Sequence, residues 1–196
     1  MDSSSIIITE KPSSVSWEQI SEVLVISHAH NREQGIILPF PHLPPCELQT
    51  KIEGHQGRMF VAMDGEKLVG TAALFFINKK LWCGEGKYAY CCLASILPDY
   101  AGLGIYRRLE EAEEEYVKSC GCNRMMFDSH EKNTRIFDVS RKNGYKFIEY
   151  RVRKDHRSIL MVKWLDKCPY PDFVFKCLFP LIKLYRLGIS RFSYIR

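Results

Sequence analysis

The sequence of 196 residues contains no long uncharged apolar run, whereas a membrane-spanning helix needs about 18 such residues in succession. The N-terminal region also lacks the basic, apolar and small-residue segments of a secretory signal peptide, because Asp2 is acidic and Glu10 closes the short apolar run. Glycine and proline are too few, at 12 and 9 residues, for a collagen-like or low-complexity chain. These absences predict a cytoplasmic protein with a globular fold.

Common metal and nucleotide motifs are absent as well. The eight cysteines include no C-x-x-C spacing, so we expect reduced thiols and no metal site. No G-x-x-x-x-G-K-[ST] motif occurs, and the third glycine of a G-x-G-x-x-G motif would fall at Arg107. The net charge of +5 is small for this length and predicts no nucleic-acid partner.

The chain contains enough apolar material to build its own core, with 46% hydrophobic and 12% aromatic residues. Its charge is uneven, because residues 168–196 carry four of the five net positive charges and interleave them with large apolar side chains. We therefore predict a domain over residues 1–167 and a basic, apolar C-terminal extension over residues 168–196. The extension suits a helix packed on the domain or a homodimer contact, and the alternative is peripheral contact with an anionic membrane.

Local patterns predict the secondary structure. Ser16 and Gln19 have the spacing of a capping box at the start of a helix, and Asp64-Gly65 suits the tight turn of a hairpin. Alternation along a later strand places Cys92 and Leu93 on opposite faces. Helices are predicted near 16–28, 46–53, 105–117 and 132–141, and strands near 60–63, 67–77, 87–97, 124–128, 145–150 and 158–164. The predicted fold class is α/β, with a mixed sheet flanked by helices.

A Gly-x-Gly turn joins a predicted strand to an amphipathic helix. Gly102 and Gly104 lead directly into this helix, whose polar face includes Glu110 and Glu113. Unpaired N–H groups and the positive end of the helix dipole make such a start favourable for anions, and glycine lets a phosphate approach the backbone. Arg107, in the first turn, is placed either to bind a polyanion or to pair with glutamates one turn later.

Residues 99–104, Asp-Tyr-Ala-Gly-Leu-Gly, resemble the [Gln/Arg]-x-x-Gly-x-[Gly/Ala] loop of the GNAT superfamily of acyl-CoA-dependent N-acyltransferases. A second block is similar too, because Asn133 and Gly144-Tyr145 stand where the family has an asparagine before a helix that ends in Gly-Phe or Gly-Tyr. The resemblance covers residues 58–165. It implies a mostly antiparallel central sheet that is splayed between two central strands, with helices on both faces.

The resemblance also implies that acetyl-CoA is the cosubstrate. Backbone groups near Ala94 and Ile96 would pair with its pantetheine arm, the glycine loop would hold its pyrophosphate, and Asn133 would face the arm. Asp99 departs from the family's Gln or Arg at the start of the loop. The predicted cofactor-binding residues are Ala94, Ile96, Ala101, Gly102, Leu103, Gly104, Ile105, Arg107 and Asn133.

Acyl transfer needs a neutral amine, a polarised thioester carbonyl and a proton for the leaving thiolate. Ser140 stands where many GNAT members place the tyrosine that supplies this last proton. Other candidate proton carriers follow the central strand, lie between the last two strands, or lie near the first helix, where His28 and His30 occur. The predicted catalytic residues are His156, Ser140, Asp128 and His30.

These observations predict an N-acetyltransferase that moves an acetyl group from acetyl-CoA to a primary amine of a small molecule. The basic, apolar extension favours an amino sugar of a glycan precursor as the acceptor. Two alternatives stay open, namely acetylation of a protein amine and a non-catalytic domain that binds or senses acyl-CoA.

Overall fold

The computed structural model describes residues 5–36, 38, 43–152 and 156–175. The chain divides into two compact units, Met1–Met125 and Met126–Arg196, and each unit is considered separately. No helix in the described residues is long and apolar enough to cross a membrane.

The first unit is built on an antiparallel sheet in the order β1 (Ile6–Glu10), β2 (Arg58–Asp64), β3 (Lys67–Leu81) and β4 (Gly84–Ile96). The predicted hairpin is confirmed, because Asp64 pairs with Lys67 and Gly65 takes a left-handed φ of +59° in the turn between them. The strand after the turn is longer than predicted and continues to Leu81. Strand β1 was not predicted.

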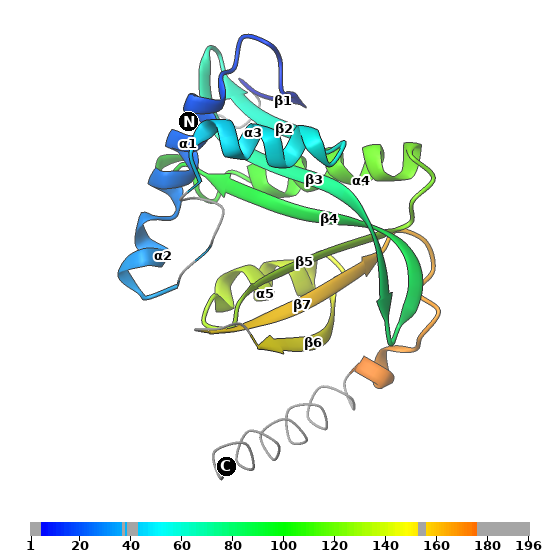
Figure 1. Cartoon of the computed structure of the whole chain (residues 1–196). Helices are drawn as coiled ribbons and strands as arrows, with labels where there is room; N and C mark the ends of the chain where they lie inside the picture. Colours follow the sequence, from blue (N-terminus) through cyan, green and yellow to red (C-terminus); the bar gives the residue numbers. More distant parts are fainter. Residues whose placement is uncertain (1–4, 37, 39–42, 153–155, 176–196) are drawn as a thin grey trace. The chain divides into compact units, whose positions relative to one another are not determined.

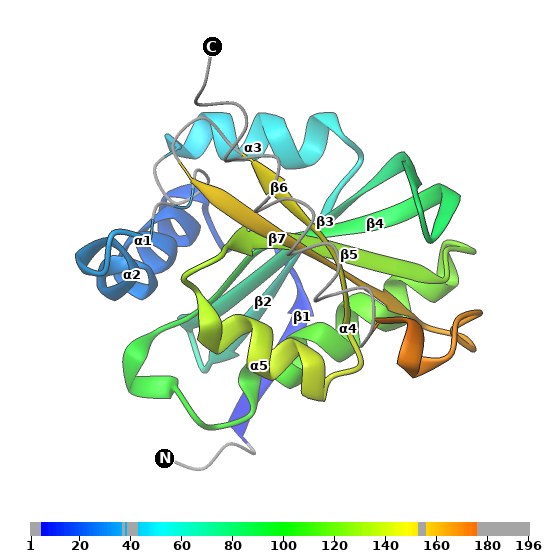
Figure 2. The ribbon, with the colours of Figure 1, turned by 90° about the horizontal axis from the view of Figure 1, so that it is seen from below.

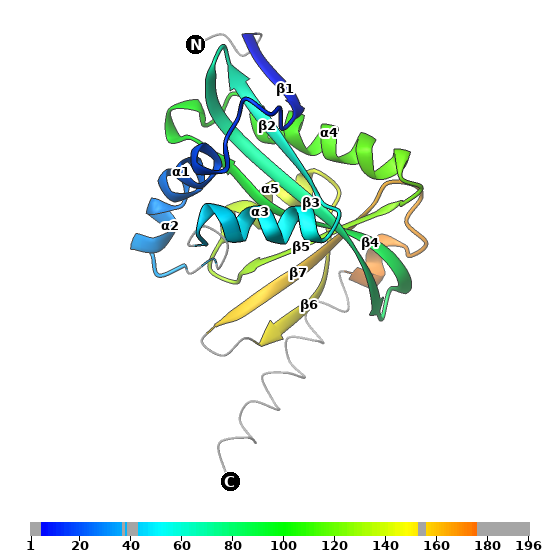
Figure 3. The ribbon, with the colours of Figure 1, turned by 45° about the horizontal axis from the view of Figure 1, so that its top comes forward.

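Helices cover both faces of this sheet. Helices α1 (Trp17–Ser27) and α3 (Pro45–Gly54) lie on one face, and α4 (Ile105–Ser119) lies on the other (Figures 1 and 3). The predicted capping box starts α1, because Ser16 and Gln19 exchange side-chain and backbone hydrogen bonds. A short helix, α2 (Ala29–Glu33), was not predicted and lies next to the end of α1 (Figure 2).

The core between α1, α3 and the sheet is apolar. Its fully buried members include Ile20, Leu24, Leu48 and Val61. Leu93 belongs to the same cluster, and Cys92 packs against it, so these neighbours lie on the same side of the sheet. The predicted alternation is therefore wrong at Leu93.

A bulge in β4 causes this break in alternation. Ala73 of β3 pairs with Cys92, but Thr71, two residues away on β3, pairs with Ser95, three residues further along β4. Leu93 takes a left-handed φ of +56° to accommodate the additional residue. The bulge changes the direction of the strand immediately before Ala94.

The described part of the second unit is built on three strands and a longer helix. Strand β7 (Arg157–Trp164) lies between β5 (Arg124–His130) and β6 (Lys146–Val152), and β6 pairs with β7 in antiparallel register (Figure 1). Helix α5 (Thr134–Lys142) packs on β5 through Phe127 and Phe137, whose ring centroids are 6.3 Å apart. Mostly antiparallel strands flanked by helices give the mixed α/β class that the sequence predicted.

The described part of the C-terminal extension packs on this second unit. Lys146 Nζ lies 2.8 Å from a carboxylate oxygen of Asp172, and the Phe175 ring lies 5.8 Å from the Trp164 ring. Phe175 is buried. Residues 176–196 lie outside the described residues, so the boundary predicted between 167 and 168 stays a prediction.

Candidate active site

The predicted glycine loop forms the start of α4. Gly104 is the N-cap residue, and both Gly102 (φ +85°) and Gly104 (φ +74°) adopt left-handed backbone conformations that favour glycine. A Cβ atom added at either position would meet no atom within 4 Å. Open space therefore lies beside the backbone at both glycines.

The N–H groups of this loop are available to a ligand. The Ala101 N–H donates to the Pro98 carbonyl at 3.0 Å, so it belongs to the preceding turn. Among the described residues, no backbone carbonyl accepts a hydrogen bond from the N–H groups between Gly102 and Ile105. These donors point from the start of a 15-residue helix whose dipole favours negative charge. The arrangement suits a phosphate group.

Two long-range hydrogen bonds hold the loop in place. The Tyr100 hydroxyl donates to a carboxylate oxygen of Asp64 at 2.9 Å, which ties the loop to the β2–β3 turn. The Arg108 guanidinium donates to the Ile6 carbonyl at 2.6 Å, which ties the first turn of α4 to β1. The loop is thereby fixed before any ligand binds, which lowers the entropic cost of binding.

Arg107 contacts the glutamates of its own helix. Its Nε atom lies 2.8 Å from a carboxylate oxygen of Glu111, and its Nη1 atom lies 3.8 Å from one of Glu110 and 4.0 Å from one of Glu114. These ion pairs raise the pKa of the Arg107 guanidinium, with the Glu111 hydrogen bond as the largest cause. The pairing is the alternative that the sequence left open, and the predicted contact with the cofactor stays a prediction.

The segment of β4 predicted to bind the pantetheine arm follows the bulge directly. Ala94 and Ile96 are half-buried, and the preceding Leu93 carbonyl accepts a hydrogen bond of 2.8 Å from the Thr71 hydroxyl. Thr71 is completely buried. Its hydroxyl therefore stabilises the bulge that sets the direction of the predicted cofactor segment.

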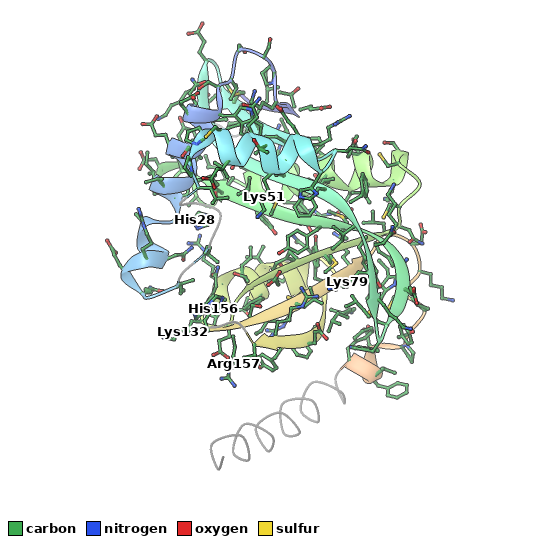
Figure 4. The ribbon with its side chains drawn as sticks, in the orientation of Figure 1. His28, Lys51, Lys79, Lys132, His156 and Arg157 are labelled. Atoms are coloured by element: carbon green, nitrogen blue, oxygen red, sulfur yellow. The ribbon has the colours of Figure 1, made fainter. Side chains whose placement is uncertain are left out.

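A polar cluster lies on the α1 face of this same segment. Ser95 is buried, and its Oγ atom lies 2.8 Å from Nε2 of His28, at the end of α1 (Figure 4). The second ring nitrogen of His28, Nδ1, lies 2.9 Å from the side-chain amide of Asn31. The predicted catalytic residue His30 lies beside this cluster in sequence, but its side chain is outside the described residues.

In the second unit, Asn133 is the N-cap residue of α5, as its position in the family pattern implied. Its side-chain amide donates to the Ser129 hydroxyl at 3.2 Å. Ser140, in the last turn of α5, is completely buried, and its hydroxyl has no hydrogen-bond partner among the described residues. A buried hydroxyl without a partner is energetically unfavourable in this state.

The predicted proton carrier His156 lies in the loop before β7 and contacts His130, at the end of β5. His156 stacks on His130 with ring centroids 4.9 Å apart and an interplanar angle of 13°, and Figure 4 shows His156 near Lys132 and Arg157. His130 is held by the Lys132 N–H, which donates to its Nδ1 atom at 3.1 Å. The stacked pair is therefore fixed from the His130 side.

Asp128 lies in a charged environment on β5. The Arg151 guanidinium lies 3.8 Å from a carboxylate oxygen of Asp128 and 3.0 Å from one of Glu149. The Asp128 carboxylate is itself nearly buried. The Asp128 carboxylate is therefore held beside a cation on β5.

A comparison of the sequence with known families decides the family. The profile of the acetyltransferase (GNAT) family matches residues 24–145, which is more than half of the chain. The chain belongs to the GNAT acetyltransferase family. This result confirms the predicted family and the predicted enzyme class.

Solved structures agree on the GNAT fold. An acetyltransferase from Streptococcus agalactiae 2603 matches with 20% identity and a TM-score of 0.64 over 82% of this chain and 99% of its own. A PaiA N-acetyltransferase from Thermoplasma acidophilum, solved in complex with coenzyme A, matches with 20% identity and a TM-score of 0.63 over the same shares of the two chains. A GNAT acetyltransferase from Elizabethkingia anophelis, solved with acetyl-CoA bound, matches with 12% identity and a TM-score of 0.61, again over 82% and 99%. A search of curated protein sequences gives no match.

One feature of this GNAT chain contradicts the sequence analysis. Glu110 and Glu113 were predicted on the exposed face of α4, but both are buried. Glu113 lies in the row of Ile105, Leu109 and Val117, each four residues apart along the helix, and this spacing was the signal that could have revealed its burial. Desolvation, followed by the neighbouring Glu110 and Glu114, raises the pKa of Glu113 well above its usual value.

The described part of the GNAT chain offers no metal centre. It contains no group of three or more histidine, cysteine, aspartate or glutamate side chains placed to hold a metal ion. Seven cysteines in the described residues are free thiols.

Proposed function

We propose that this GNAT protein transfers an acetyl group from acetyl-CoA to the primary amine of a small molecule. The observation that carries the proposal is the glycine loop, where N–H groups without backbone partners lie at the start of α4 beside open space. These donors are suited to a pyrophosphate. In CoA, the pyrophosphate is the negatively charged group next to the pantetheine arm. Two relatives in fold were solved with acetyl-CoA or coenzyme A bound.

The residues of this chain have separate tasks in that reaction. The N–H groups between Gly102 and Ile105 hold the pyrophosphate, and the backbone of Ala94 and Ile96 orients the pantetheine arm. Acetyl-CoA supplies the activated acetyl group as a thioester. A backbone N–H near the β4 bulge polarises the thioester carbonyl, because a fixed donor stabilises the charge that develops on its oxygen. Arg107 contributes positive charge beside the phosphates.

The residues of the second unit keep the roles that the family resemblance implies. Asn133 faces the cofactor arm, and either Ser140, through water, or His156 gives the leaving thiolate its proton. Asp128 is an alternative carrier, and its carboxylate lies 3.8 Å from the Arg151 guanidinium. His30 stays a candidate on the acceptor side.

An amino sugar is the first acceptor class to test. A structure similar in fold is an aminoglycoside 6'-acetyltransferase, with 17% identity, a TM-score of 0.62 and coverage of 84% of this chain and 99% of its own. The cations and apolar side chains of residues 168–196 also suit an acidic, lipid-linked or nucleotide-linked amino sugar. The proposal includes no nucleic-acid partner. For residues 168–196 it includes two alternative roles, a homodimer contact and peripheral contact with a membrane.

The test is a release assay for the CoA thiol with acetyl-CoA and a panel of amines, which includes free and nucleotide-linked amino sugars, polyamines and peptides. Turnover with small amines and none with peptides supports the proposal. Turnover confined to peptides identifies a protein acetyltransferase instead. Binding of CoA, measured by calorimetry, without turnover of any amine identifies the non-catalytic alternative.

A further inference from the structure

The strand that the proposed function assigns to the acetyl donor also carries a buried hydroxyl. Ser95 lies between Ala94 and Ile96, with 5% of its surface exposed. It pairs with Thr71 immediately beyond the β4 bulge, so its position is fixed by the same irregularity that directs the donor segment. Ser95 is thus one residue from the backbone groups assigned to the thioester arm.

His28 contacts this hydroxyl from a helix end that is itself fixed. Its Nε2 atom lies 2.8 Å from Ser95 Oγ, although the two residues are 67 positions apart in sequence. The His28 N–H donates to the carbonyls of Leu24 and Ile26, and its own carbonyl accepts from the Arg32 N–H at 3.1 Å. The imidazole therefore extends from a backbone that is held on both sides.

Asn31 completes the arrangement on the other side of the ring. Its side-chain amide lies 2.9 Å from His28 Nδ1. Rotation of this amide by half a turn presents its oxygen instead of its nitrogen to the ring, so it accommodates either imidazole tautomer. When Nδ1–H donates to the Asn31 oxygen, Nε2 has a free lone pair and accepts the hydroxyl proton of Ser95. A hydroxyl, an imidazole and an orienting amide in this order form a proton-accepting chain.

We propose that Ser95 and His28, oriented by Asn31, accept the proton that the acceptor ammonium must lose before it attacks acetyl-CoA. This inference rests on the proposed function. The acceptor N–H proton passes to Ser95 Oγ while the Ser95 hydroxyl proton passes to His28 Nε2, and the N–H electron pair remains on nitrogen as the attacking lone pair. Half-buried His28 then returns the proton to water. Ser95 is unchanged at the end and forms no bond to the acetyl group.

The first test compares variants that keep or remove proton acceptance. His28→Gln can still hydrogen-bond to Ser95 but cannot take its proton, so kcat should fall by about 10²-fold while the Kd for CoA stays within about threefold of the wild-type value. Ser95→Ala should lose a similar factor, whereas Ser95→Thr keeps the hydroxyl and most of kcat. His55→Gln, at an exposed histidine of the same unit, is the matched control.

The second test adds imidazole in solution to His28→Ala. A diffusible base should restore part of the lost kcat in this variant and none in Ser95→Ala, a pattern that a purely structural hydrogen bond would not produce. If His28→Ala does not fold, His28→Gln and the Ser95 pair still decide the question. Wild-type kcat in His28→Gln, or an acetyl group on Ser95 detected by mass spectrometry, would overturn the proposal. If the wild type turns over no amine, the proposed function fails, and this inference fails with it.

Discussion

Single residues in this protein are constrained for two different reasons. Gly102 and Gly104 have left-handed backbone angles and no neighbour within 4 Å of an added Cβ atom. Glycine is favoured at these positions because it adopts such angles without strain and lets a ligand approach the backbone. Glu113 is the opposite case, because its carboxyl is buried and its Oε1 atom has no hydrogen-bond partner among the described residues. The first kind of residue affects binding, and the second affects stability.

Gly104→Val should weaken CoA binding. The β-branched side chain is strained at a φ of +74° and occupies the space beside the N–H groups. We expect the Kd for CoA, measured by calorimetry, to rise at least tenfold, which corresponds to about 1.4 kcal/mol. Gly121→Val is the control, because Gly121 has a similar φ of +66° and no neighbour within 4 Å but lies beyond the other end of α4. Equal affinity of both variants would contradict the assignment of the loop.

Glu113→Gln should stabilise the protein at neutral pH. The raised pKa means that the folded chain keeps the Glu113 proton at pH values where the unfolded chain has released it. The free energy of unfolding therefore falls as pH rises above the unfolded pKa of about 4.3 and toward the folded pKa. Removing the acid should raise the free energy of unfolding at pH 7 by about 1 kcal/mol and flatten this decline.

Urea unfolding of both proteins at several pH values between 4 and 8 measures the effect. Glu115→Gln is the control, because Glu115 is exposed on the same helix. A Glu113→Gln variant with the same pH slope as the wild type would show that the carboxyl ionises freely in the folded state.

At the scale of one element, the bulge in β4 matters to the proposed site as much as the regular part of the strand does. Strand β4 pairs with β3 along most of its length, but the bulge at Leu93 changes its direction next to Ala94. The buried Thr71 hydroxyl donates to the Leu93 carbonyl within this bulge. The donor segment and Ser95 both depend on this local geometry.

Thr71→Val should disturb the bulge while keeping the volume of the side chain. The Leu93 carbonyl loses its 2.8 Å hydrogen bond from the threonine hydroxyl, which should cost about 1–3 kcal/mol of stability because the group is buried. We also expect a higher KM for acetyl-CoA. Thr50→Val is the control, because the exposed Thr50 hydroxyl makes the same type of hydrogen bond, to the Cys46 carbonyl at 2.8 Å. Thermal unfolding that is equal in the two variants would contradict this role.

At the scale of the whole molecule, the C-terminal extension has two parts with different expected roles. Residues 168–175 pack on the second unit, where Phe175 is buried against Trp164. Residues 176–196 contain five lysines and arginines and no aspartate or glutamate. The first part should therefore contribute to stability, and the second should supply the charge for an anionic surface.

Two truncations separate these roles. Removal of residues 176–196 should leave the melting temperature and the Kd for CoA unchanged, but it should abolish co-sedimentation with anionic phospholipid vesicles. Removal of residues 168–196 should also lower the melting temperature, because a buried phenylalanine contributes about 1.5–3 kcal/mol. Vesicle binding by the full chain should weaken as salt screens the charges. Full-length protein that never binds vesicles would exclude the membrane role.

The sequence by itself predicted the helix starts and turns that depend on residues within a few positions of each other. The capping box at Ser16, the Asp64-Gly65 turn and the glycine loop before α4 depend on side-chain and backbone preferences within a few positions. The family resemblance followed from two such blocks at a fixed separation. These features could be predicted because they require no knowledge of distant partners.

Tertiary structure alone decided the features that join distant segments. Strand β1 exists because its five residues pair with β2, and only its first residue is buried, so its own pattern is too weak to predict a strand. The contact between His28 and Ser95 spans 67 positions, and the burial of Glu113 depends on the sheet beneath α4. For β1 and for the contact between His28 and Ser95, the deciding partner lies far away in the sequence, and a periodic pattern within one element carries no information about it. For Glu113, the four-residue spacing along α4 indicated burial, and the tertiary structure supplied the sheet that covers it.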